Sequence, residues 1–128
     1  MTDTEELRAD EIPAPFTARD AYNGAPEIPA ETHAVLRLQV TSGDHAAPPE
    51  EVREYLLRHA ALADRVAEES GDGDDQARAE KMGRALLDHD RRHGLKGSPY
   101  PPDHEIWTHR GPRAYTRQEY VTWHRPTA

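Results

Sequence analysis

Two stretches of the chain, residues 50–69 and 74–93, repeat apolar residues at steps of three and four positions. In the first stretch the stripe is formed by Val52, Tyr55, Leu56, His59, Ala63, Val66 and Ala67, and in the second by Ala79, Met82, Ala85, Leu86 and His89. This spacing places the apolar side chains on one face of an α-helix, so both stretches are predicted to be amphipathic helices. The loop between them is short, which favours an antiparallel helical hairpin.

The residues that flank these stretches are typical helix starts and stops. Pro49 suits a first helical turn, where its missing N–H would have no partner in any case. Asp74 or Asp75 is the expected N-cap of the second helix, since a short acidic side chain can accept the free backbone N–H groups there. Gly71 and Gly94 follow the two stretches and favour left-handed helix ends.

Residues 34–41 alternate in a different way. Val35, Arg37, Gln39 and Thr41 take turns with Leu36, Leu38 and Val40, which is the period of a half-buried strand. We therefore expect one short strand here. A lone strand leaves its backbone groups unpaired, so this prediction also favours a pairing partner, either in the same chain or in a second copy.

The remaining segments predict a third helix and an irregular N-terminus. Gly111-Pro112 is a helix start, and the following residues read as a short helix to about His124, with 104–109 as a short strand or turn. Residues 1–32 hold four prolines and eight acidic residues. Such a segment is either a flexible tail or an arm that packs on its own domain or a partner through Ile12, Phe16, Tyr22 and Ile28.

Taken together, these patterns predict a mainly α fold. It consists of an antiparallel two-helix hairpin plus a shorter C-terminal helix, with one short strand and a loose acidic N-terminal arm. Residues 1–32 form the acidic, proline-containing arm, for which disorder is one of the alternatives, and residues 33–128 form a single small helical domain.

Composition limits this fold to one modest core, because 35% of the 128 residues are hydrophobic and 31% are charged. The net charge of −8 opposes non-specific binding to nucleic-acid phosphates. The sequence has no long apolar run and begins with acidic and polar residues, so neither a membrane span nor a signal peptide is predicted, and the expected location is cytoplasmic. The arginine-rich basic residues are typical of high-GC genomes, such as those of actinobacteria.

Candidate chemistry is sparse. The absence of cysteine excludes disulfides and thiolate sites. No phosphate-binding glycine loop and no serine-nucleophile motif are present, so we expect no cofactor and no catalytic residues. His59, with Asp64 and Asp88 in hairpin register, is either an acid–base group or, as we favour, a hydrogen-bonded core histidine.

His89 and His93 are the candidate metal ligands. Their spacing places both imidazoles on one helix face, and the pattern resembles the HExxH motif of zinc metalloproteases with Asp90 in place of the glutamate. The alternative is a pair of histidines that stabilises the negative end of a helix dipole in its last turn.

The C-terminal segment mixes aromatic and basic residues, which are enriched in interfaces and also stack on single-stranded nucleic acid. The candidate partner-binding residues are Trp107, Arg110, Arg113, Tyr115, Arg117, Tyr120 and Trp123. Packing of the same residues into the protein's own core is the alternative that we favour.

The sequence as a whole predicts a non-enzymatic accessory or adaptor protein that binds an unknown protein partner or itself. The alternatives are a nucleic-acid-associated protein that uses the C-terminal segment and a small metal-binding protein with histidine ligands.

Overall fold

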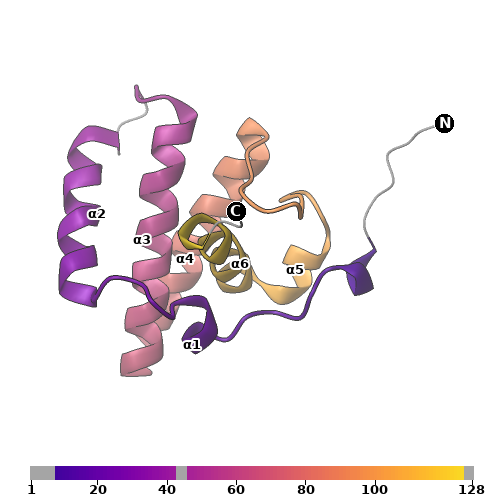
Figure 1. The fold of residues 1–128 in the computed structure, drawn as a ribbon, viewed down its shortest axis with the longest axis horizontal. Helices are drawn as coiled ribbons and strands as arrows, with labels where there is room; N and C mark the ends of the chain where they lie inside the picture. The colour runs from indigo at the N-terminus through magenta and orange to yellow at the C-terminus, as the bar shows by residue number, and fades with distance from the viewer. Residues whose placement is uncertain (1–7, 43–45, 126–128) are drawn as a thin grey trace.

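The computed structural model describes residues 8–42 and 46–125 of the chain (Figure 1). In this part the chain forms a short 3-10 helix, η1 (Ala9–Glu11), and the α-helices α1 (Ala18–Ala21), α2 (Ile28–Ser42), α3 (Pro49–Ser70), α4 (Gly73–His93), α5 (Ile106–Arg110) and α6 (Pro112–His124). The prediction of a mainly α protein is confirmed. No strand occurs in these residues.

Helices α3 and α4 occupy the two stretches with helical spacing and pack against each other along their length. Pro49 stands in the first turn of α3, and Gly71 ends that helix with a left-handed φ of 65°. The N-cap of α4 is Asp72 and not the predicted Asp74 or Asp75, and its side chain accepts from the backbone N–H groups of those two residues. Gly94, also at φ 65°, ends α4.

The strand predicted at residues 34–41 is wrong, because these residues form the greater part of α2. The alternating pattern also contains a helical stripe, in which Glu31, Val35 and Ser42 are buried at steps of four and seven. A lone strand would leave its backbone groups unpaired, whereas a helix bonds them internally and still lays that stripe on a neighbour. Helix α2 packs chiefly against α3 and forms one edge of the molecule (Figure 1).

The core lies between α3, α4 and α6, which cross near the centre of the molecule (Figure 1). Its buried members are Ile12, Leu57, Ala61, Leu86, Leu87, Ile106, Trp107, Tyr115 and Tyr120. A second, alanine-rich cluster of Ala63, Ala67 and Ala79 joins α3 to α4. Gly83 of α4 allows α6 to approach closely, since an added Cβ would lie 2.9 Å from the carbonyl oxygen of Pro112.

Residues 8–32 follow the surface of this core. Ile12 and Ala21 are buried, and Arg110 and Arg125 hold the segment by donating to the carbonyl groups of Pro13 and Asp20. The boundary predicted at residue 32 falls inside α2. Among the described residues, therefore, no break in the fold separates the N-terminal segment from the rest. Residues 1–7 lie outside the described part of the chain.

Candidate functional site

Three of the four large aromatic residues of the C-terminal segment lie inside the protein. Trp107, Tyr115 and Tyr120 each expose 1% of their surface or less. Trp107 and Tyr115 pack edge to face with ring centroids 5.1 Å apart, and Tyr120 packs in the same manner on Tyr22 of the N-terminal segment. These side chains therefore join α5 and α6 to the core and offer no surface to a partner.

The basic residues of the same segment are paired within the protein. Arg113 and Arg117 of α6 both bind Asp64 of α3, with closest N–O distances of 2.6 and 2.7 Å, and both reach Glu68 at the edge of the cluster. Asp64 is fully buried and also accepts from the hydroxyl of Tyr22 at 2.5 Å. One carboxylate thus connects α3, α6 and the chain just after α1.

A second buried cluster connects α3, α4 and α6. Arg53 donates to both oxygens of Asp90 at 2.8 and 3.0 Å and to Glu119 at 2.6 Å. Both carboxylates are fully buried. Glu119 also accepts from the hydroxyl of Ser98 and from the backbone N–H groups of Gly97 and Ser98, and so fixes the proline-rich turn after α4.

Two of the predicted partner-binding residues lie nearer the surface. Arg110 donates to the carbonyl groups of Ile12 and Pro13, so its guanidinium is used to hold the N-terminal segment. Trp123 is 37% exposed, and the guanidinium of Arg58 lies 5.2 Å from its ring centroid. Arg58 in turn forms a two-point ion pair with Glu31, which joins α2 to α3.

Burial and charge shift the pKa values of several groups in these clusters. Burial, with the charges of Glu119 and Asp90, raises the pKa of Tyr115 above its ordinary value. Burial alone would raise the pKa of Asp64, but hydrogen bonds from Arg117, Tyr22 and Arg113 lower it overall. Burial lowers the pKa of His59, whose Nδ1 lies 3.2 Å from the hydroxyl of Tyr55. These groups are positioned to stabilise helix contacts.

The two buried tyrosines of α6 give a matched test of this network. Tyr115 donates to Asp90 at 2.5 Å, whereas the buried hydroxyl of Tyr120 has no hydrogen-bond partner among the described residues. We expect Tyr115→Phe to lower the free energy of unfolding by about 1.5–3 kcal/mol, since it removes a bond to a charged group. Tyr120→Phe should change it by less than about 0.5 kcal/mol or raise it. Urea unfolding of both variants measures this, and equal losses would contradict it.

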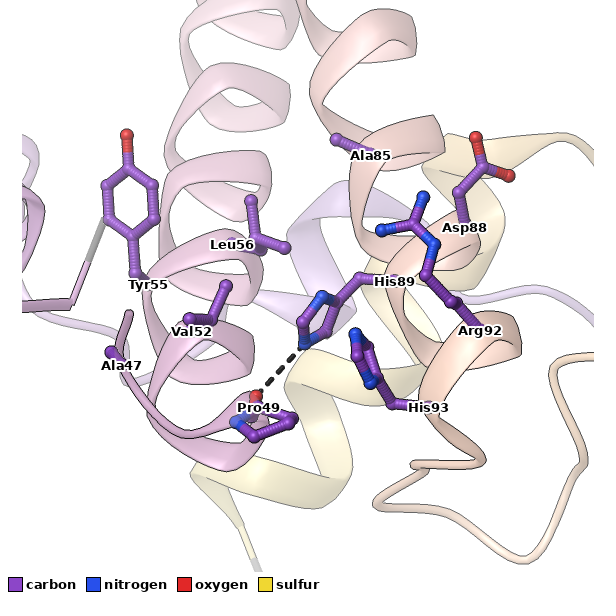
Figure 2. Close-up of a pocket in the computed structure, with 10 residues that line it drawn as sticks. All are labelled: Ala47, Pro49, Val52, Tyr55, Leu56, Ala85, Asp88, His89, Arg92 and His93. Carbon is purple, nitrogen blue, oxygen red and sulfur yellow. Dashed lines mark hydrogen bonds between the residues drawn. The ribbon is translucent and has the colours of Figure 1, made fainter. Parts of the chain in front are cut away.

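His89 and His93 lie beside each other at the end of α4, with ring centroids 4.5 Å apart. They line a pocket of about 380 Å³ between the start of α3 and the end of α4 (Figure 2). We call it the His89 pocket, and its lining residues are Ala47, Pro49, Val52, Tyr55, Leu56, Ala85, Asp88, His89, Arg92 and His93. It combines an apolar floor with polar groups from the last turns of α4.

The geometry gives the two histidines different surroundings. The Nε2 of His89 donates to the carbonyl oxygen of Pro49 at 3.0 Å, and His89 is 93% buried, since its exposed fraction is 7%. His93 is exposed. Within residues 8–42 and 46–125, no three histidine, aspartate or glutamate side chains are grouped closely enough to hold a metal ion. The described residues therefore give the histidine pair no third protein ligand.

The outer face of α2 carries large aliphatic side chains that nothing covers in the described part of the chain. Leu36 is 55% exposed and Val40 is 83% exposed. We define this outer face by five exposed residues that share one stripe of the helix, Pro29, His33, Leu36, Arg37 and Val40. A groove of about 340 Å³ follows the flank of the same helix and shares His33 and Arg37 with it.

The sequence interpretation did not predict that four carboxylates, those of Glu31, Asp64, Asp90 and Glu119, are buried. Asp64 stands within the apolar stripe of α3, beside Ala60, Ala61 and Ala67, and Asp90 follows Leu86 and Leu87 on α4. A carboxylate in an apolar stripe indicates a buried acid, which needs a basic partner. The arginine-rich C-terminal segment supplies Arg113 and Arg117 as the partners of Asp64, whereas Asp90 pairs with Arg53 of α3. For Asp64, the two sequence features together were the signal.

Comparison of the chain with protein-family models, with curated proteins and with solved structures gave no match. No helix in the described ranges is long and apolar enough to cross a membrane.

Proposed function

We propose that this chain is a non-enzymatic accessory protein and that it binds a partner protein through the outer face of α2. The observation that carries the proposal is the exposure of Leu36 and Val40 on a helix whose opposite side packs on α3. Contiguous exposed apolar patches mark contact surfaces, and Leu36 and Val40 lie one turn apart on the same helix. An apolar helix face of this kind can pack against an apolar row on a partner.

The charge pattern of α2 supports the same surface. Residues 32–42 contain no acidic residue, although the whole chain carries 24 acidic residues against 16 basic ones. Interface centres are depleted in charged residues compared with the rest of a surface. Arg37 and His33 flank the aliphatic pair, so the partner that fits is one with an apolar row edged by carboxylates.

The C-terminal segment supports nucleic-acid binding less well. Arg113 and Arg117 already pair with Asp64 and Glu68, and Arg110 binds backbone carbonyl groups. A cation that is neutralised inside the protein releases no counterion from a phosphate backbone. The net charge of −8 also opposes binding to nucleic-acid phosphates. For this reason we place the binding surface on α2 and not on α6.

The test replaces the aliphatic pair with serine. Leu36→Ser combined with Val40→Ser should leave the free energy of unfolding within about 1 kcal/mol, because both side chains are already exposed. The same double change should weaken the complex about tenfold or more, since fully burying a Val or Leu side chain contributes about 1.5–3 kcal/mol. Affinity is measured by titration calorimetry with the purified partner, after capture from an extract of the source cells.

The matched control is Ala77→Ser with Lys81→Ser, two exposed positions on α4 with the same spacing. Binding that is retained by this control and lost by the α2 variant supports the proposal, provided the two purified proteins reproduce it. A partner that both variants bind equally well would move the interface away from α2. A stable dimer of the chain alone, converted to a monomer by the α2 variant, would assign the face to self-association and overturn the proposed partner.

A further inference from the structure

The His89 pocket is separate from the outer face of α2 and has the composition of a small-molecule site. Val52, Leu56 and Ala85 supply an apolar floor from two helices, and the charged and imidazole side chains stand together on the α4 side, whereas Tyr55 lies on the α3 side (Figure 2). Its volume of about 380 Å³ lies within the usual range for pockets that hold small ligands. A ligand with an apolar body and a polar head would match this division.

His89 presents one defined hydrogen-bonding atom to the pocket. A carbonyl oxygen can only accept, so the Nε2 that contacts Pro49 carries the hydrogen. In the neutral ring the Nδ1 is then an acceptor, and Figure 2 shows it pointing away from Pro49 toward Leu56. His89 is 93% buried, as its exposed fraction is 7%, and no described residue hydrogen-bonds to this Nδ1. The pocket therefore offers an acceptor for a hydroxyl or N–H group of a ligand.

Arg92 supplies the charge at the rim. It forms no ion pair within 4 Å with any residue that the structure describes, in contrast with Arg53, Arg113 and Arg117. Its guanidinium lies on the same side of the pocket as the Nδ1 of His89 (Figure 2). Asp88 also lines the rim, but its carboxylate points away from His89. A guanidinium without a partner matches a carboxylate.

We infer that the His89 pocket binds a small hydroxy acid with an apolar body. The apolar body contacts Val52, Leu56 and Ala85, the carboxylate pairs with Arg92, and the hydroxyl donates to the Nδ1 of His89. No bond of the ligand is broken in this arrangement. The site gives the protein a way to respond to a small organic acid, independently of the partner surface on α2.

The experiment uses the full chain and three matched probes. These are 3-phenyllactate, 3-phenylpropionate, which lacks the hydroxyl, and 3-phenyllactamide, which lacks the charge. Backbone amide signals are followed by two-dimensional NMR as each probe is added up to about 10 mM. We expect 3-phenyllactate to shift the signals of Val52, Leu56 and His89 saturably, and both of the other probes to bind at least about threefold more weakly.

Two variants test whether Arg92 supplies the positive charge that binds the carboxylate of the ligand. Arg92→Gln should weaken the binding of 3-phenyllactate about fivefold, which is the size expected for one exposed ion pair. Arg84→Gln, an exposed arginine of α4 that does not line the pocket, should change it less than twofold. Both positions are exposed, so both variants should fold.

The proposal would be overturned by the absence of shifts at 10 mM, by shifts confined to residues outside the pocket, or by equal affinity in Arg92→Gln. Equal affinity for all three probes would show an apolar cavity without hydroxy-acid recognition and would overturn it too. None of these results depends on whether α2 binds a partner, so the two proposals fail independently.

Discussion

Replacing Glu119 with alanine is expected to lower the free energy of unfolding by about 3–5 kcal/mol. Glu119 is fully buried and accepts four hydrogen bonds, from Arg53, from the backbone of Gly97 and from both the backbone and the hydroxyl of Ser98. Alanine removes the acceptor of the buried Ser98 hydroxyl and N–H and leaves Arg53 with Asp90 alone, and each buried donor without a partner costs free energy. Such a loss is a large share of the total stability of a small domain.

Urea unfolding at neutral pH measures this effect. The control is Glu80→Ala, since Glu80 is an exposed residue of α4 and its removal should change the free energy of unfolding by less than about 0.5 kcal/mol. The Glu119 variant should also expose the proline-rich turn near Ser98 to proteolysis, because its anchor is gone. Similar stability of the two variants would show that the buried network contributes little.

The long helices could be predicted because their signals are local. The stripes of α3 and α4 repeat over several turns, and Pro49, Gly71 and Gly94 mark ends that depend on backbone geometry at single residues. Pro112 likewise begins α6 as the sequence indicates. Where a helix buries one face and ends at residues with special backbone conformations, the sequence pattern alone is sufficient to predict the helix and its ends.

Helix α2 could not be predicted in the same way, because its pattern fits two periods. Val35 is buried and Leu38 is half-buried, whereas Leu36 and Val40 are exposed, so the apolar residues lie around the helix and also alternate along it. Glu31, in the first turn of α2, pairs with Arg58 of α3 and so connects the two helices. That contact is made between residues distant in sequence, and the spacing within α2 contains no trace of it.

The candidate site likewise combines features that the sequence predicts with features that depend on contacts between distant residues. The sequence indicates that the C-terminal segment is rich in arginine and aromatic residues, but it does not indicate whether they face inward or outward. Asp64 determines the direction of two of these arginines, because its buried carboxylate pairs with Arg113 and Arg117. Asp90 instead pairs with Arg53 of α3 and accepts from the hydroxyl of Tyr115. The exposed face of α2 was missed for the converse reason, since a strand had been expected to bury Leu36 and Val40.

Replacing Asp64 is expected to have the second large effect on the free energy of unfolding, and this effect depends on pH. Asp64→Asn keeps the shape of the side chain but leaves Arg113 and Arg117 with only the exposed Glu68 as a charged partner. We expect a loss of about 3 kcal/mol in the free energy of unfolding at pH 7, the size found when one partner of a buried ion pair is removed. The hydroxyl of Tyr22 also loses its carboxylate acceptor, which loosens the segment after α1.

The difference in stability between the wild type and Asp64→Asn should narrow in acid. Folding lowers the pKa of Asp64, whereas in the unfolded chain it returns to about 4. As the pH falls, the unfolded chain therefore binds the proton first, and the stability that Asp64 contributes is complete above about pH 4 and is lost as the pH falls through the lower folded-state pKa. Below pH 4 the gap between wild type and Asp64→Asn should narrow by up to about 1.4 kcal/mol per pH unit.

Urea unfolding from pH 7 to pH 3 measures the gap, with Glu69→Gln at an exposed site of α3 as the control. A gap that stays constant over this range would mean that the charge of Asp64 does not stabilise the cluster.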